Sequence, residues 1–142
     1  MIRAFTVAAF AAAAIASSSM ARADGFDGTY RGSLVCEKMA AAPDILRAPF
    51  DMIVSGKTAT FARPVFDVRG TLVIGSELAT GTVEDGGAIK LTSTWSIGGV
   101  SYQGSYSGAI AAHSGTMTGT QAWKTRAGDV MRGCTVAFVQ RS

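Results

Sequence analysis

The stretch Gly28–Cys36, GTYRGSLVC, alternates between two kinds of side chain, and it decides the fold. Its apolar positions, Tyr30 and Cys36 among them, share one face of an extended strand, because successive side chains point to opposite sides. Residues 130–140, VMRGCTVAFVQ, show the same alternation near the other end of the chain, with Cys134 on the apolar face. Both stretches are therefore expected to be strands with one buried face.

The N-terminal residues 1–23 predict export. A basic residue, the apolar run 4–16 and an A-x-A cleavage site at 21–23 are the parts of a secretory signal peptide. We expect a mature chain that starts at Asp24 and forms a single domain over 24–142. Its expected location is the bacterial periplasm or the cell exterior. We do not expect it to be embedded in a membrane, because the apolar run is too short for a membrane helix.

The two cysteines of such an exported chain are expected to form a disulfide. A disulfide holds its Cα atoms about 4.4–6.8 Å apart, so the first and last strands must approach each other. If Cys36 faces Cys134 in an antiparallel pair, Leu34 faces Val136, and the apolar faces of both strands fall together. In a meander with an even number of strands, this pairing closes the sheet into a barrel.

Between these ends, glycine-containing turn signals separate further alternating segments. The expected strands are residues 28–36, 48–55, 58–63, 77–84, 88–97, 100–110, 115–124 and 130–140. The longer connection 37–47 is expected to hold a helical turn, and 64–76 is a mixed segment with room for a short strand at 71–74. The sequence thus predicts an eight-stranded antiparallel up-and-down β-barrel, with a two-sheet β-sandwich as the alternative.

Charge excludes one class of function. The whole chain has thirteen basic and ten acidic residues, and its net charge is +3. Arg3 and Arg22 leave with the signal peptide, so the mature chain is nearly neutral. Such a chain lacks the basic surface that binding to phosphate backbones requires, and we expect no nucleic-acid partner.

Five residues on neighbouring expected strands are candidates for a ligand site. They are Trp95, Tyr102, Tyr106, Gln121 and Trp123. Aromatic side chains that converge with one amide are typical of a cavity for a small, largely apolar ligand, which the amide orients. The simpler alternative is that these side chains fill the interior, since an eight-stranded barrel is only wide enough for side chains or one small ligand.

No catalytic, metal or cofactor site is expected. Glu84 and Asp85 precede a Gly-Gly turn and are expected to point to solvent, and His113 lies at an expected loop tip without a partner in its own motif. The arginines are interleaved with acidic residues and are expected on solvated faces: Arg63, Arg69, Arg126, Arg132 and Arg141. Arg132 alone shares its strand face with Cys134, so an inward position, paired with an anion or stacked on an aromatic ring, is the alternative for it.

The start Gly28-Thr29-Tyr30, a long first connection and a meander of about eight strands resemble the lipocalin and avidin type of small barrel. Lipocalins usually have Trp where Tyr30 stands, and avidin-type biotin sites use an Asn, which this sequence lacks. Residues 46–50, 75–77 and 118–123 are similar to small exported alphaproteobacterial proteins of unassigned function. These resemblances imply a fold and a location, and they imply no activity.

Two kinds of non-enzymatic function fit these observations. The first is a binding protein that holds a small, largely apolar ligand inside the barrel, with residues 37–47 as a partial cover. The second is a protein-interaction module, such as an envelope accessory protein or an enzyme inhibitor, that acts through its loops.

Overall fold

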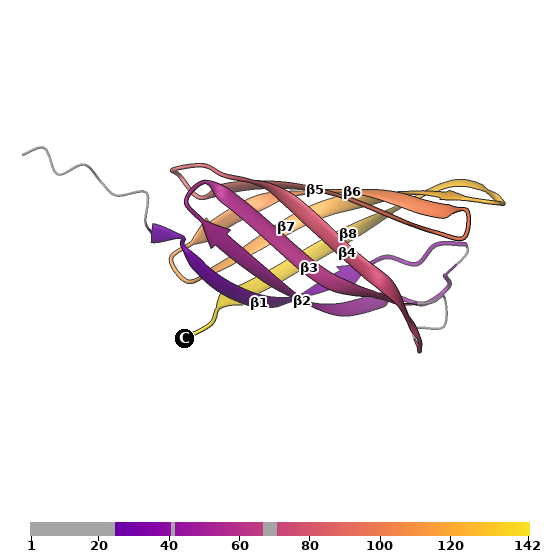
Figure 1. Ribbon diagram of the computed structural model, residues 1–142, viewed down its shortest axis with the longest axis horizontal. Helices are drawn as coiled ribbons and strands as arrows, with labels where there is room; N and C mark the ends of the chain where they lie inside the picture. Colours follow the sequence, from indigo (N-terminus) through magenta and orange to yellow (C-terminus); the bar gives the residue numbers. More distant parts are fainter. Residues whose placement is uncertain (1–24, 41, 67–70) are drawn as a thin grey trace, which may run out of the picture.

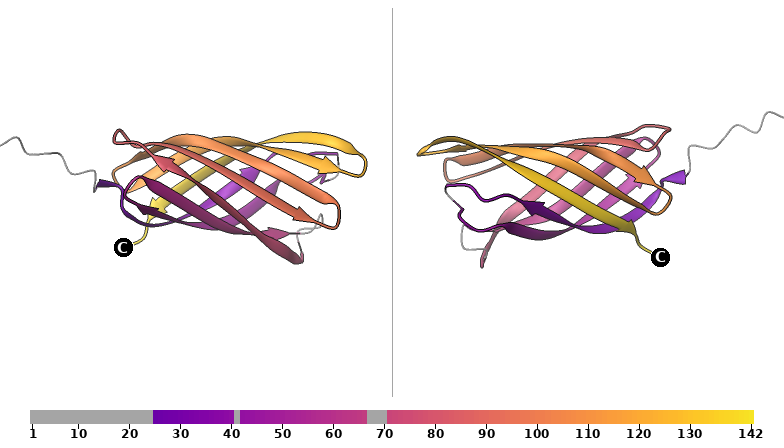
Figure 2. Two further views of the ribbon diagram at one scale, coloured as in Figure 1. Left: turned by 45° about the horizontal axis from the view of Figure 1, so that its top comes forward. Right: turned by 180° about the vertical axis from the view of Figure 1, so that it is seen from behind.

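The computed structural model describes residues 25–40, 42–66 and 71–142, which form a closed barrel of eight antiparallel strands (Figure 1, Figure 2). The strands follow one another round the barrel in chain order. They are β1 (Gly28–Cys36), β2 (Leu46–Ser55), β3 (Thr58–Phe66), β4 (Val73–Val83), β5 (Ala88–Ile97), β6 (Val100–Ala111), β7 (Ser114–Thr125) and β8 (Gly128–Gln140). The up-and-down barrel is confirmed, and the sandwich alternative is wrong.

Closure occurs in the register that the cysteines predict. Cys36 pairs with Cys134, Leu34 pairs with Val136, and the disulfide joins the two cysteines with their Cα atoms 4.0 Å apart. A disulfide is compatible with an exported protein. The expected signal peptide and the mature start at Asp24 lie outside the described residues. In the part of the chain that the structure describes, no helix is long and apolar enough to cross a membrane.

The two long connections differ from expectation. Instead of a helical turn, the described part of 37–45 contains an isolated β-bridge between Met39 and Ala42. Much of the segment 64–76 is strand, because β3 continues to Phe66 and β4 already starts at Val73. Residues 73–74, part of the short strand expected at 71–74, therefore belong to β4, which was expected to start at 77. The sequence predicted that β3 would end before Pro64, because proline has no N–H for strand pairing. Proline is tolerated here because no strand pairs with this part of β3 on its other side.

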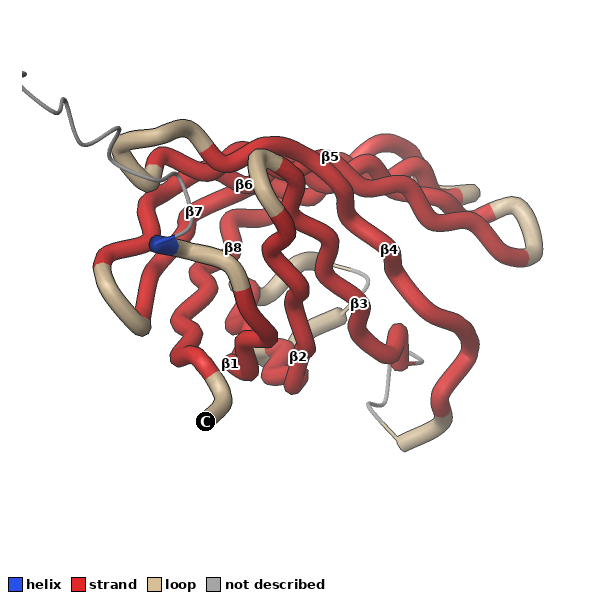
Figure 3. The backbone as a smooth tube through the Cα atoms, turned by 60° about the vertical axis from the view of Figure 1, so that its left-hand side comes forward, coloured by secondary structure: helices blue, strands red, loops and turns tan. Residues whose placement is uncertain are grey.

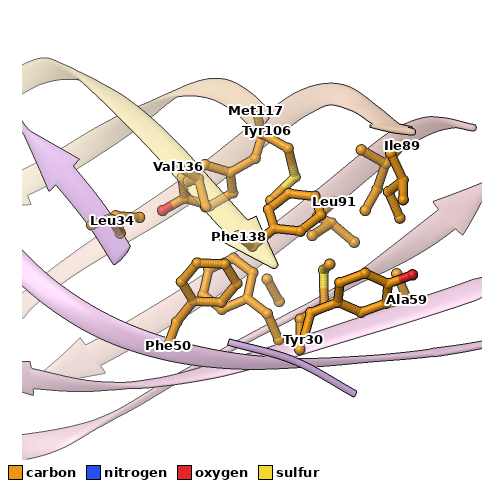
Figure 4. Close-up of a cluster of buried hydrophobic side chains, with 14 of the residues drawn as sticks. Tyr30, Leu34, Phe50, Ala59, Ile89, Leu91, Tyr106, Met117, Val136 and Phe138 are labelled. Carbon is orange, nitrogen blue, oxygen red and sulfur yellow. The ribbon is translucent and has the colours of Figure 1, made fainter. Parts of the chain in front are cut away.

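One end of the barrel interior is filled, and we call it the closed end. Short turns join the strands there, and Phe26 packs against the core while its carbonyl accepts a hydrogen bond from Tyr30. Aromatic and aliphatic side chains from all eight strands meet inside (Figure 4). Gly32 makes this packing possible, since a Cβ there would lie 2.1 Å from the carbonyl oxygen of Ala137 and 2.6 Å from the ring of Phe50.

At the other end, the open end, two pairs of neighbouring strands separate. The pairing of β2 with β3 stops at Asp51 and Ala62, and that of β4 with β5 stops at Leu78 and Thr94. The ends of β3 and β4 beyond these points pair with each other. Figure 3 shows β4 diverging from β5 at this end. The wall is thus continuous round the closed end and split by two seams at the open end.

Candidate functional site

A layer of buried polar side chains crosses the barrel between the filled core and the open end. Its centre is the carboxylate of Glu77 on β4, which is fully buried. Glu77 accepts hydrogen bonds from the Arg63 guanidinium, the Ser93 hydroxyl and the Tyr106 hydroxyl, the last at 3.0 Å. Three donors thus satisfy the oxygens of this carboxylate, as a buried carboxylate requires.

Gln121 on β7 extends the layer toward β8. Its Nε2 donates to the hydroxyl oxygen of Tyr106 over 2.9 Å. Its Oε1 accepts from Trp123 Nε1 at 3.2 Å and from Arg132 Nε at 2.9 Å. The amide therefore links the acidic centre of the layer to a tryptophan and an arginine at its edge.

Burial fixes the protonation of the two tyrosines in and beside this layer. It raises the pKa of Tyr102 and of Tyr106 above the ordinary tyrosine value, and the Glu77 charge raises that of Tyr106 further. Both hydroxyls therefore keep their protons and act as hydrogen-bond donors or acceptors. Neither is suited to be a general base.

The charges of the layer do not cancel. Arg63 pairs with Glu77, but Arg132, only 6 % exposed, has no carboxylate within 4.0 Å among the described residues. Its guanidinium lies 5.2 Å from the centre of the Trp123 ring. Burial, and then the positive charge of Arg63, lower the pKa of Arg132 to about 10. Arg132 stays charged at neutral pH, and the layer carries one uncompensated positive charge.

Beyond the polar layer lies a cavity of about 500 Å³ that opens at the split end of the barrel. Its lining includes Val65, Ile74, Trp95, Ile97, Val100, Trp123, Arg63 and Arg132 from the wall, and Met39, Ala42, Asp44 and Ile45 from the first connection. The surface of the cavity is mainly apolar, and Arg63 and Arg132 are its buried charged residues, whereas Asp44 and Arg47 are exposed.

An aromatic cluster forms one wall of the cavity. Trp95 stacks on Tyr102 with ring centres 5.6 Å apart, and Tyr102 lies 4.5 Å from the ring of Trp123. Tyr102 is held from behind by a hydrogen bond of 2.9 Å from Arg63. Packing on both sides and this hydrogen bond fix the rings, so the wall is rigid.

The five candidate residues do come together, but in two layers. Trp95 and Trp123 line the cavity, and Tyr102 packs between them. Tyr106 and Gln121 lie beneath the cavity in the polar layer, where each bonds to other protein groups. Packing and cavity lining are therefore both present, and the role of the five in binding stays a prediction.

The expectation that all the arginines lie on solvated faces was wrong for Arg63 and Arg132. Arg63 lies on the same face of β3 as the buried Phe61 and Val65. The surface prediction was based on its charge alone. The inward alternative for Arg132, stacked on an aromatic ring, is confirmed. Arg126 and Arg141 are exposed as expected, and Arg69 lies outside the described residues.

Glu77 and Ser93 were missed as interior groups. Both lie in phase with buried neighbours on their strands, for example Ala79 beside Glu77, and this phase was the available signal. Alternation alone does not reveal a buried charge, because a partner on another strand has to neutralise it.

The remaining candidates are at the surface. Asp85 is exposed and forms an ion pair with Lys57 at 2.9 Å, and Glu84 lies exposed beside it. His113 is exposed and its Nδ1 lies 2.5 Å from Gln140 Oε1. Within 25–40, 42–66 and 71–142, no group of three His, Cys, Asp or Glu side chains is placed to hold a metal ion.

Comparison of the chain with protein-family models, with curated proteins and with solved structures gives no match.

Proposed function

We propose that this protein is a non-enzymatic binding protein that holds a small, largely apolar molecule in the open end of its barrel. The observation that carries the proposal is the division of the interior. The same barrel is tightly filled at its closed end and hollow over about 500 Å³ at its open end. Ligand cavities in proteins measure about 300–1,000 Å³ and are mainly apolar with a few polar groups.

The mouth of the cavity also supports the proposal. Ile45 and Ile97 line the cavity, and both are about half exposed, and Val73 at the start of β4 is 56 % exposed. Exposed apolar side chains beside an apolar cavity are typical of ligand-binding grooves. The proposed ligand therefore meets apolar surface at the entrance as well as inside.

Residues of the polar layer give no support to catalysis. The Ser93 hydroxyl lies beside the Glu77 carboxylate, an arrangement that resembles a nucleophile with its base. Both are buried beneath the cavity floor and neither lines the cavity. A substrate in the cavity would not touch them, so we assign them to the support of the site.

A titration with the neutral apolar dye N-phenyl-1-naphthylamine tests the proposal. We expect saturable binding of one dye per chain with enhanced dye emission. Val100→Phe narrows the cavity and should weaken binding at least tenfold. Ile53→Phe makes a similar change on the exposed outer wall, where Ile53 is 59 % exposed, and should leave binding unchanged. No saturable binding, or equal loss in both variants, would contradict the proposal.

The seam between β4 and β5 favours a second candidate, a protein-interaction module. Beyond Leu78, β4 does not pair with β5, so an edge of each strand faces the seam. Such edges accept an added strand from a partner. Capture of an envelope protein by the native barrel that Ser96→Pro abolishes would support this candidate. Unchanged capture would count against it.

A further inference from the structure

We infer that the ligand carries one anionic group, a carboxylate for example, and that Arg132 at the inner end of the cavity binds it. This inference rests on the proposed function and names the class of ligand: an apolar body with a single negative charge. Four observations on the two arginines and their surroundings carry it.

The first observation is that Arg63 is not available to a ligand. Its Nε bonds to Glu77, one terminal nitrogen donates to the Tyr102 hydroxyl at 2.9 Å, and the other to the carbonyl of Pro64 at 3.0 Å. Every nitrogen of this guanidinium has a protein acceptor, and its charge is balanced by Glu77. Arg63 therefore borders the cavity as an electrically neutral pair with Glu77, with one protein acceptor for each of its three guanidinium nitrogens.

Arg132 differs on each of these counts. Only its Nε has an acceptor among the described residues, the amide oxygen of Gln121. Every fully buried side-chain nitrogen or oxygen in the described part of the chain has a hydrogen-bond partner. The terminal nitrogens of Arg132, for which the described residues provide no acceptor, are therefore reached by solvent, and Arg132 lines the cavity. They form an open pair of donors at the inner end of an apolar space.

The geometry suits a planar anion. Arg132 is held by the hydrogen bond from its Nε to Gln121 and lies over the Trp123 ring. A guanidinium fixed in this way presents two parallel N–H groups, which match the two oxygens of a carboxylate. The apolar body of the ligand would then extend past Trp95 and Val100 toward the mouth.

The charge balance sets the number of charges on the ligand. Glu77 cancels Arg63, and one unit of positive charge remains on Arg132. A single negative charge neutralises the interior, whereas a second would be buried without a partner, which is strongly unfavourable. The other charged side chains that line the cavity are Asp44 and Arg47, which are both exposed at the rim and whose opposite charges add to zero. Asp44 forms no ion pair with Arg132.

Two probes of equal chain length distinguish the contribution of the anionic group to affinity from that of the apolar chain. Dodecanoate and 1-dodecanol are each titrated against the native protein by displacement of N-phenyl-1-naphthylamine. Charge-assisted hydrogen bonds to a buried guanidinium favour dodecanoate by roughly ten- to a hundredfold. This comparison needs no variant. Equal affinity for the two probes would overturn the inference and leave the cavity proposal intact, whereas failure of dye and both probes to bind would overturn both.

Variants then assign the effect to Arg132. We expect Arg132→Gln to remove the preference for dodecanoate over dodecanol, and Arg132→Lys to keep part of it. Arg126→Gln is the matched control, because Arg126 is exposed at the β7–β8 turn of the same end and does not line the cavity. Asp44→Asn tests the rim acid and should raise dodecanoate affinity slightly. A preference that survives Arg132→Gln would overturn the assignment.

Discussion

The closed and open ends of this barrel are built from the same eight strands, yet they solve different problems. At the closed end, Tyr30, Phe50, Phe61 and Phe138 meet edge to face, with ring centres 5.3–6.2 Å apart. At the open end, aromatic rings line a hollow, and a buried charge lacks a protein partner. The interior of the closed end is fully packed and stabilises the fold. The open end has a cavity surface and a charge that a ligand can contact.

The polar layer separates the packed closed end from the hollow open end, and Glu77 accepts hydrogen bonds from three of its side chains. Glu77→Gln removes the counter-charge of Arg63 and leaves two buried arginines without a carboxylate. Breaking a buried pair in this way costs about 3–5 kcal/mol. We expect that loss in the free energy of unfolding measured with urea, together with weaker near-ultraviolet circular dichroism from the aromatic wall.

Glu84→Gln is the control for this prediction, because Glu84 is exposed at the turn after β4 and should change stability by less than about 0.5 kcal/mol. A similar, small effect of both substitutions would show that Arg63 finds another partner and that the layer is not a rigid unit.

A matched pair of truncations compares the two ends directly. Phe61→Ala opens a sealed void in the closed end and should destabilise the protein by about 3–5 kcal/mol. Trp95→Ala enlarges a cavity that already exists and reaches solvent, so we expect a smaller loss of about 1–3 kcal/mol. Urea unfolding of the two variants measures the difference. A larger loss for Trp95→Ala would mean that the open end is part of the stabilising core.

The disulfide stands where the pairing of β1 with β8 ends, next to the open end. Replacement of Cys36 and Cys134 by alanine should cost about 2–4 kcal/mol, because the cross-link restricts the unfolded chain. We expect the pairing of Leu34 with Val136 to persist, since both side chains are buried in the closed core. Hydrogen exchange checks this: early exchange along all of β1 would show that the disulfide, and not the core, holds the barrel closed.

The closed end was largely predictable from the sequence, and the open end was not. Alternation and the cysteine pair were sufficient for the register of β1 with β8, because Leu34 on β1 and both Val136 and Phe138 on β8 share the faces of the two cysteines. At the open end, alternation alone would have placed Arg63 inside, but its charge led to a surface prediction, and Pro64 led to the prediction of a loop. Whether the interior of the barrel is filled at a given level depends on the volumes of side chains that come from several strands. The pattern within one strand does not give this total side-chain volume, so the cavity could not be predicted from it.

The smallest expected effect distinguishes the two ends most sharply. Arg132→Met replaces an unpaired buried charge with an apolar side chain, and Gln121 Oε1 keeps its bond from Trp123. The empty protein should become more stable by about 1 kcal/mol, since an unpaired buried charge is unfavourable. Saturating dodecanoate, at about a hundred times its Kd, should stabilise the native protein by about 2.7 kcal/mol. The variant, which should bind dodecanoate ten- to a hundredfold more weakly, should gain only about 0.4–1.4 kcal/mol at the same concentration. Thermal melts with and without dodecanoate would then rank the two proteins in opposite orders. If Arg132→Met instead lowers the stability of the ligand-free protein, Arg132 stabilises the barrel wall as Glu77 does. The buried charge at the open end would then be part of the stabilising interior and not a group kept for a ligand.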